Sequence, residues 1–284
     1  MNAHKPYQGR VASLATKHGK DKVIARPLKC ALGLQVLVPE ECDTDLLGTF
    51  SGEVARAGTA LEVCERKARM GMALTGLPFG IANEGSFGPH PYLHFIPVGL
   101  EVMAFIDDEL GLVITESLFS KSTNYNQREA SEIEEIEQWL GTVQFPSHAL
   151  VVRPKSAPIG TALTKGIATK DELTRAIRWA AANSTDGTAW IETDMRAHLN
   201  PTRMVSIRRL AFRLARRLAT LCPVCRSPGW GQTCVVEGLP CQDCDIPTNL
   251  TLFNVLSCSK CTHRKEMRSL EAHASPQFCA YCNP

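Results

Sequence analysis

The chain has 284 residues, with 31 Lys and Arg against 29 Asp and Glu, and a formal net charge of +2 gives no global field that would favour nucleic acid or an anionic membrane. Its first ten residues lack the apolar core of a signal peptide, and no apolar stretch reaches the roughly 18 residues needed to cross a bilayer. We therefore expect a cytoplasmic protein with no membrane partner.

Residues 1–155 are predicted to form an α/β domain with a mixed sheet and flanking helices, because short apolar runs alternate with helical patterns. Three S/T-x-x-E sequences predict capping boxes at helix starts. These pairs are Thr59 with Glu62, Ser131 with Glu134, and Thr169 with Glu172. The runs that we expect to be strands are VASLA, LQVLV, LEVMAFI, LVIT and ALVV.

Residues 156–220 are predicted to form a helical extension. A helix is expected over about 170–183, and a dense polar segment follows at 192–203. Asn200 and Pro201 suit the N-cap and first turn of a last helix, in which leucines recur on one face and arginines lie elsewhere. The leucines are Leu210, Leu214, Leu218 and Leu221, and the arginines run from Arg203 to Arg217.

A lysine-containing loop follows the first predicted strand. A turn between that strand and a helix beginning near Asp21 would place cationic side chains and free backbone N–H groups at a helix N-terminus, where both favour phosphate. Lysines on a solvated surface are the alternative interpretation. The candidate phosphate-binding residues of this loop are Thr16, Lys17, His18 and Lys20.

The next motifs are a helix start over 58–68, the sequence TGLP at 75–78 and the stretch 81–90, IANEGSFGPH. Together with the loop, their order resembles the inosine triphosphate pyrophosphatase family, which removes pyrophosphate from non-standard nucleoside triphosphates using magnesium. In that family a strand ends in a T/S-x-N-x-x-K-like phosphate loop, an E-N-A-x-x-K-A helix follows, and TGLP leads to an acidic D-S-G turn. The resemblance covers residues 13–91 of this chain.

The resemblance implies roles for individual residues. Lys20 matches the phosphate-loop lysine, and Lys17 stands where the asparagine would be. Glu62 and Lys67 match the glutamate and lysine of the helix motif, and Glu84 falls at the acidic turn. The implied activity is a nucleoside-triphosphate pyrophosphatase-like hydrolase with Mg²⁺ as cofactor. Carboxylates that could hold this ion are Glu53, Glu62 and Glu84, although Glu62 is also accounted for as a capping residue.

A second candidate set lies in the loop expected from Glu84 to His94. Two glycines and two prolines would fix its backbone while presenting side chains suited to acid–base or metal chemistry. A structural loop with incidental histidines is the alternative. The candidates are Glu84, Ser86, His90 and His94.

The polar segment 192–203 could complete the same site, with arginines on phosphate and an acid or histidine near metal. A solvated loop is the simpler interpretation, but two arginines, two acids and a histidine exceed what helix capping requires. The candidate ligand-binding residues are Asp194, Arg196, His198 and Arg203.

Four C-x-x-C pairs occupy the predicted domain 221–284, with 15, 13 and 17 residues between successive pairs. This spacing resembles zinc ribbons, since each pair offers two thiolates on one side of a turn and two pairs complete a tetrahedron. We predict two structural Zn²⁺ ions, with sequential pairing favoured over a cross-braced arrangement; redox or iron–sulfur chemistry suits the pattern less well. The pairs are Cys222/Cys225, Cys241/Cys244, Cys258/Cys261 and Cys279/Cys282.

Two functions remain open from the sequence. The first is a metal-dependent hydrolase of nucleotides or related phosphorylated molecules with a zinc-binding tail. The second is a non-enzymatic zinc-ribbon module that binds nucleic acid or a protein partner, with the helix Arg203–Arg217 contributing cations. The combination of an α/β domain with a zinc tail also resembles an uncharacterised bacterial family.

Overall fold

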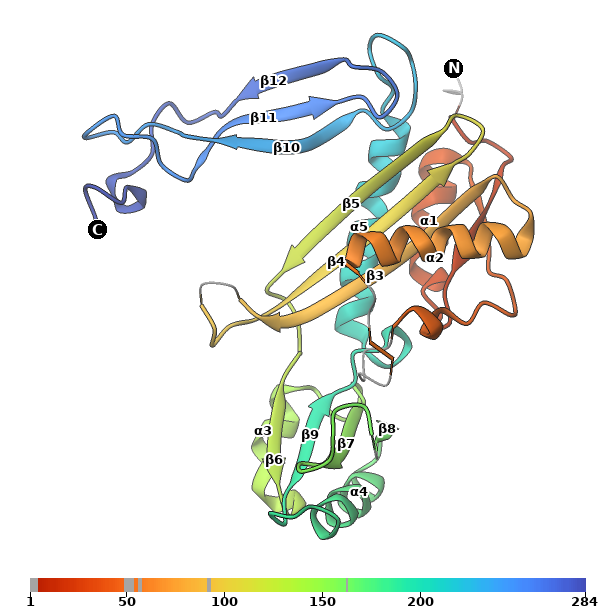
Figure 1. The fold of residues 1–284 in the computed structure, drawn as a ribbon, viewed down its shortest axis with the longest axis vertical. Helices are drawn as coiled ribbons and strands as arrows, with labels where there is room; N and C mark the ends of the chain where they lie inside the picture. Colours follow the sequence, from red (N-terminus) through yellow and green to blue (C-terminus); the bar gives the residue numbers. More distant parts are fainter. Residues whose placement is uncertain (1–4, 49–53, 56–57, 91–92, 162) are drawn as a thin grey trace. The chain divides into compact units, whose positions relative to one another are not determined.

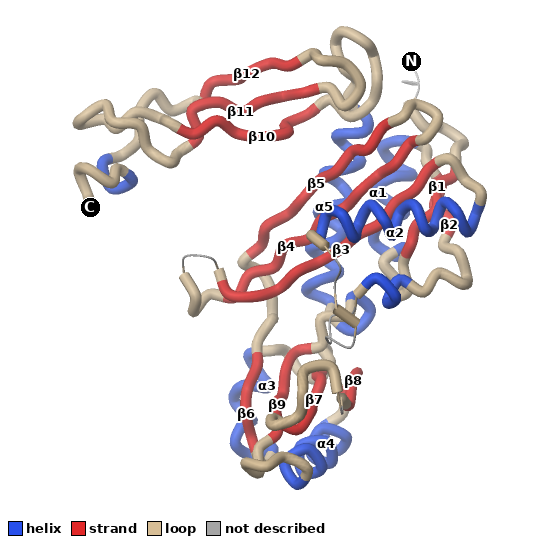
Figure 2. Tube along the Cα trace, in the orientation of Figure 1, coloured by secondary structure: helices blue, strands red, loops and turns tan. Residues whose placement is uncertain are grey.

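The computed structural model describes residues 5–48, 54–55, 58–90, 93–161 and 163–284. The chain divides into two compact units, residues 1–215 and 216–284. Figure 1 and Figure 2 show the helices and strands of each unit. In the part of the chain that is described, every helix is too short or too polar to cross a membrane.

A five-stranded mixed sheet forms the centre of the first unit, with strand order β2-β1-β3-β4-β5. β1 is parallel to β2 and β3, while β4 and β5 continue the sheet antiparallel. This confirms the predicted α/β class with a mixed sheet. The strands are β1 (Val11–Ala15), β2 (Gln35–Leu37), β3 (Phe79–Pro89), β4 (Pro97–Asp107) and β5 (Leu112–Ser120).

Helices cover both faces of this sheet. α2 (Ala60–Thr75) packs on one face, where a Cβ at Gly80 would lie 2.6 Å from the Met72 side chain. α1 (Asp21–Leu32) and α5 (Pro201–Ala219) lie on the other face (Figure 1). The connection through α1 leads from β1 to β2 on one side, and the connection through α2 leads to β3 on the other side. The carboxyl end of β1 is therefore a topological switch point, where open α/β sheets bind ligands.

The prediction of a loop from Glu84 to His94 is wrong for its first part, because β3 extends to Pro89. Gly, Asn and Pro are poor strand formers and obscured this strand in the sequence. Pairing with β4 along its whole length, from Phe79↔Asp107 to Pro89↔Pro97, holds it extended.

Two of the three predicted helix starts form as expected. Thr59 and Glu62 make a reciprocal capping box, and the Thr169 side chain accepts a hydrogen bond from the Glu172 backbone. The predicted capping pair of Ser131 with Glu134 is wrong by one residue. Glu132 and Glu135 form the box instead, because the short helix begins one position later.

A four-stranded antiparallel sheet, in the order β6-β9-β7-β8, follows in the first unit and packs against α4 (Lys170–Ala182) around its own apolar core. The boundary expected at residue 155 falls between β7 and β8, which pair with each other. The strands are β6 (Gln127–Ala130), β7 (Leu150–Pro154), β8 (Thr164–Ile167) and β9 (Ala189–Thr193). The short helices are α3 (Glu137–Thr142) and the 3-10 segments η1 (Thr44–Leu47), η2 (Ile133–Ile136) and η3 (Ala197–Leu199).

The second unit is a three-stranded antiparallel meander of β10 (Gly231–Glu237), β11 (Thr251–Ser257) and β12 (Arg264–Arg268), followed by η4 (Pro276–Phe278). One cysteine pair precedes β10, one lies in each connection and one follows β12. Because successive strands reverse direction, the first and third pairs lie at one end of the sheet and the second and fourth at the other.

Candidate ligand-binding and metal sites

Five charged side chains are buried together near the switch point. Lys20 and Lys67 are each 6% exposed, and Glu84, Glu101 and Arg203 are 4% exposed or less. Charged side chains are almost never this buried unless they are paired. The residues come from the loop after β1, from α2, β3 and β4, and from the first turn of α5.

Lys20 lies where β1 ends and β3 continues. The pairing of the two strands stops at Ala15↔Ala82, so the next carbonyl of β3, that of Asn83, has no strand partner on this side. The Lys20 ammonium group donates a hydrogen bond to that carbonyl at 2.6 Å. Lys20 follows the first strand, as the sequence predicts, and it therefore lies at the opening of the switch point.

Two buried ion pairs lie on opposite faces of the sheet beside Lys20. Glu84 accepts a hydrogen bond from Lys67 of α2 at 2.7 Å, and Glu101 accepts one from Arg203 of α5 at 2.7 Å. Side chains alternate between faces, and Glu101 is opposite Gly85 in the register, which explains this division. Gly85 provides the space, since a Cβ there would lie 2.6 Å from Arg203 Nη2.

The cluster carries more positive than negative charge, with three cations and two carboxylates. Burial, reinforced by the Arg203 guanidinium, lowers the pKa of Lys20 to about 8. Asn83 donates from Nδ2 to Glu101 and to the Val102 carbonyl, but its buried Oδ1 has no hydrogen-bond partner in the described part of the chain. The site is therefore suited to an anionic ligand that also offers a donor.

Two histidines stack beside the cluster, His18 from the loop after β1 and His198 from η3, with ring centroids 5.1 Å apart. Burial lowers the pKa of His18 to about 4 and also lowers the pKa of His198. Both imidazoles are therefore neutral at pH 7. Near them, Asp194 is 2% exposed and pairs with Arg196 at 2.6 Å.

The remaining sequence candidates lie outside the buried cluster. Lys17 is exposed and pairs with Asp43 and Asp45, although Thr16 in the same loop is buried. Glu62 is exposed, and its carboxylate accepts a hydrogen bond from the Thr59 backbone N–H in the capping box of α2. Glu53 falls outside the described residues.

The expected convergence of His90 with Lys20 and Glu84 is not observed. His90 follows the end of β3, six residues beyond Glu84, which is roughly 20 Å along a strand, and its ring contacts Phe119. Ser86 is half-buried within β3. His94 lines a separate surface depression with Phe95 and Tyr125.

Sequence reasoning missed Asn83 and Glu101 as members of the cluster. The only signal for Glu101 was an acidic residue inside the apolar run LEVMAFI. A buried charge in such a strand requires a partner, but that partner, Arg203, is 102 residues away in the chain.

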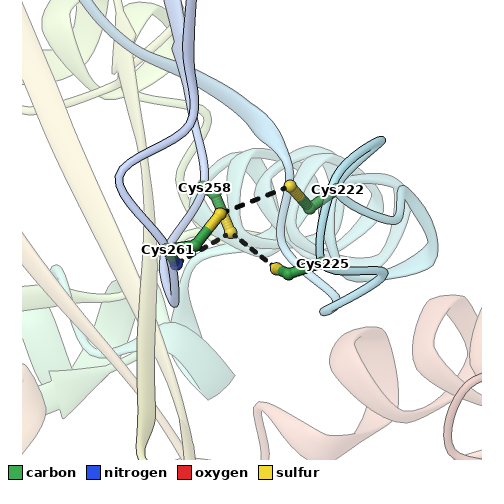
Figure 3. Close-up of side chains that lie close together, drawn as sticks. All are labelled: Cys222, Cys225, Cys258 and Cys261. Atoms are coloured by element: carbon green, nitrogen blue, oxygen red, sulfur yellow. Dashed lines mark hydrogen bonds between the residues drawn. The ribbon is translucent and has the colours of Figure 1, made fainter.

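Two sets of four cysteines are assembled in the second unit, and Figure 3 shows the set that contains Cys222. In each set the ligand atoms all lie within 4.8 Å of one another. The predicted sequential pairing is wrong, and the cross-braced alternative is observed, because the meander places alternate pairs at the same end. The sets are Cys222, Cys225, Cys258 and Cys261, and Cys241, Cys244, Cys279 and Cys282.

The sulfur spacing matches a tetrahedral metal site. Four sulfurs at 2.3 Å from a central ion would lie about 3.8 Å apart. The Sγ–Sγ distances include 3.5 Å for Cys225–Cys258 and 3.6 Å for Cys244–Cys279. Backbone N–H groups of Lys260 and Cys261 also point at Cys258 Sγ, at 3.3 and 3.4 Å, as expected for a thiolate acceptor. Both sets could hold a metal ion.

The fold and these sites define an α/β protein with a C-terminal unit built around two four-cysteine sets. The chain belongs to the family described as a domain of unknown function (DUF6671), whose model matches residues 67–284. The matched range includes all eight cysteines and four of the five charged residues of the cluster, but not Lys20. A comparison with curated proteins found no match. The resemblance to inosine triphosphate pyrophosphatases stays a prediction.

Proposed function

We propose that the first unit binds a phosphorylated small molecule at the carboxyl end of β1 and hydrolyses its phosphoanhydride bond. The observation that carries this proposal is the burial of Lys20, Lys67 and Arg203 against only two carboxylates at the switch point. Buried cations in excess are costly, and a bound phosphate would supply the missing negative charge.

Each cation has a distinct part in this proposal. Lys20 is the first contact for the phosphate, because among the described residues its ammonium group is hydrogen-bonded only to a backbone carbonyl. Lys67 forms an ion pair with Glu84, and its ammonium group can exchange this carboxylate for a phosphate oxygen. Three contacts fix the Arg203 guanidinium, namely those with Glu101, the Met195 carbonyl and the Phe87 ring. Its positive charge therefore keeps a fixed position beside the proposed phosphate.

Mg²⁺ is the proposed cofactor, since hydrolysis of phosphoanhydrides commonly uses an ion bound by one or two carboxylates and the substrate phosphates. Glu84 would hold it, on the face of the sheet that Lys67 also occupies, whereas Glu101 lies on the opposite face. Its carboxylate oxygens suit a hard cation. The ion would neutralise phosphate charge and activate water.

A panel of standard and non-standard nucleoside triphosphates, assayed with and without Mg²⁺ for phosphate and pyrophosphate release, tests the activity. We expect Lys67→Ala and Glu84→Gln to reduce turnover by about 100-fold or more, as for loss of a group at the reacting phosphates. The matched control is Glu65→Gln, at a partly exposed position of α2 outside the cluster. The proposal fails if no nucleotide is hydrolysed or shifts the melting temperature.

We also propose that both four-cysteine sets hold Zn²⁺ as a structural ion. Four thiolates are the soft ligands that zinc favours, and they leave no position for a catalytic water. The support is the sulfur spacing together with the size of the unit, which has few buried apolar residues for its length. Metal analysis of the purified protein should find close to two equivalents of zinc.

A second candidate function rests on the charge distribution of the second unit. Of its seven Lys and Arg residues, six lie before β10 or within 260–265, toward the first cysteine set, and Arg268 ends β12 toward the second. Arg226, Lys260 and Lys265 are exposed beside the first set and have no ion-pair partner among the described residues. Such an end could contact nucleic-acid phosphates.

The helix expected to contribute cations is less available than the sequence implied, since Arg203 is buried and Arg213 donates to the Ser117 carbonyl. Retention on nucleic acid at low salt, lost in the Arg226→Ala, Lys260→Ala, Lys265→Ala variant, would support the second candidate. Retention unchanged in that variant would exclude this surface.

A further inference from the structure

A basic cleft lies outside the buried cluster, between the start of α1 and the first turns of α5. It has a volume of about 320 Å³, which is within the usual range for small-molecule sites. Its apolar lining includes Val23, Met204 and Val205, its cationic lining consists of Lys22 and Arg208, and the neutral imidazole of His198 also lines it.

The two strong cations of this cleft are uncompensated. Lys22 and Arg208 are exposed and have no ion-pair partner within the described ranges, and no acidic residue lines the cleft. By contrast, nearby Lys17 is bound by two aspartates. The end of the Lys22 side chain lies over Gly19, with Nζ 4.0 Å from the position of a Cβ there, so its charge is directed to the cleft.

Helix geometry separates this cleft from the first site. Pro201, Met204, Val205 and Arg208 follow the three-to-four-residue spacing of one face of α5. Arg203, which binds Glu101, lies on another face of the same helix. The histidine stack marks the boundary between the two sites, because His198 lines the cleft while its stacking partner belongs to the loop after β1.

We propose that this cleft binds a small organic phosphate, with the phosphate between Lys22 and Arg208 and an apolar body on Val23, Met204 and Val205. Two cations from different helices favour a dianion over a monocarboxylate, because each charge then has a partner. The apolar floor favours a phosphate ester over inorganic phosphate, since the ester buries carbon atoms that would otherwise face water. This proposal does not depend on hydrolysis at the first site.

Calorimetric titration with phenyl phosphate and with inorganic phosphate tests the proposal. We expect the full-length protein to bind phenyl phosphate more tightly than inorganic phosphate. The Lys22→Ala, Arg208→Ala variant should weaken one binding event about tenfold, which corresponds to two partly exposed ion pairs. The Met204→Ser variant should weaken phenyl phosphate binding but leave inorganic phosphate unaffected.

The control is the Lys29→Ala, Arg209→Ala variant, which removes one exposed cation from each of the same helices outside the cleft. It should bind phenyl phosphate like the unmodified protein. The proposal is overturned if the unmodified protein shows no saturable binding, or if the cleft variant and the control variant bind equally well. A Lys67→Ala variant that loses hydrolysis but keeps this binding event would separate the two sites.

Discussion

The cross-braced cysteine pairing can be tested by removing two ligands at a time. Cys225 and Cys258 belong to one set, whereas Cys244 belongs to the other. In the Cys225→Ala, Cys258→Ala variant one set keeps only two thiolates and the other stays complete. In the Cys225→Ala, Cys244→Ala variant each set keeps three.

The expected magnitude follows from the binding energy of a four-thiolate zinc site, roughly 10 to 16 kcal/mol. If the four ligands contribute about equally, loss of one costs about 3 kcal/mol, or roughly 150-fold in affinity. Loss of two should abolish binding at a micromolar concentration of zinc. The first variant therefore retains one ion at full affinity, and the second retains two weakened ions.

Native mass spectrometry before and after treatment with a zinc chelator measures this difference. After the treatment we expect one ion in the Cys225→Ala, Cys258→Ala variant and none in the Cys225→Ala, Cys244→Ala variant. Sequential pairing predicts the opposite outcome for the two proteins. That reversed result would refute the argument that strand direction decides the pairing.

Three further predictions concern the first unit. Gly85→Ala should lower the free energy of unfolding by about 3 kcal/mol in urea titrations, because the added Cβ would displace Arg203 from a buried ion pair. Gly88→Ala is the control, since the space around Gly88 is open, and it should change the free energy of unfolding by less than about 0.5 kcal/mol. The pKa of Lys20, about 8 in the free protein, should rise when an anion binds. Phosphate affinity should thus begin to fall as pH rises through about 8 and then drop by up to tenfold per unit until the raised pKa of the complex is passed. A Lys20→Arg variant without this decline would confirm the cause. Thr59→Ala should cost about 1 kcal/mol of stability through loss of the α2 cap, and an unchanged urea midpoint would contradict that role.

Apolar runs and caps were sufficient to predict several elements of the fold. VASLA and LEVMAFI lie in β1 and β4, and the capping residue Thr59 begins α2 as expected. β3 was missed beyond Glu84, since its glycines and final proline disfavour a strand locally. Its extended conformation comes from the neighbouring strand, and pairing of that kind is not visible in a local sequence pattern.

The candidate site was predictable in its residue types but not in its partners. Lys20, Glu84 and Arg203 were identified from motifs and local composition, and the structure brings them into one cluster. The sequence predicts that His90 joins them, since it is near Glu84 in the chain, but the strand β3 extends from Glu84 to Pro89 and keeps the two side chains apart. Glu101 was overlooked because its role depends on an arginine contributed by a helix that follows much later in the chain.

Strand direction accounts for both kinds of site in this protein. In the first unit, the connections from β1 and to β3 run to opposite sides, which opens the sheet at Lys20 and lets α2 and α5 bring cations from opposite faces. In the second unit, three alternating strands bring non-consecutive cysteine pairs together at each end. Each four-cysteine set therefore ties together one end of the meander. If each set holds an ion as proposed, loss of one ion should loosen that end first, while the strand pairing near the other set remains held by the second ion.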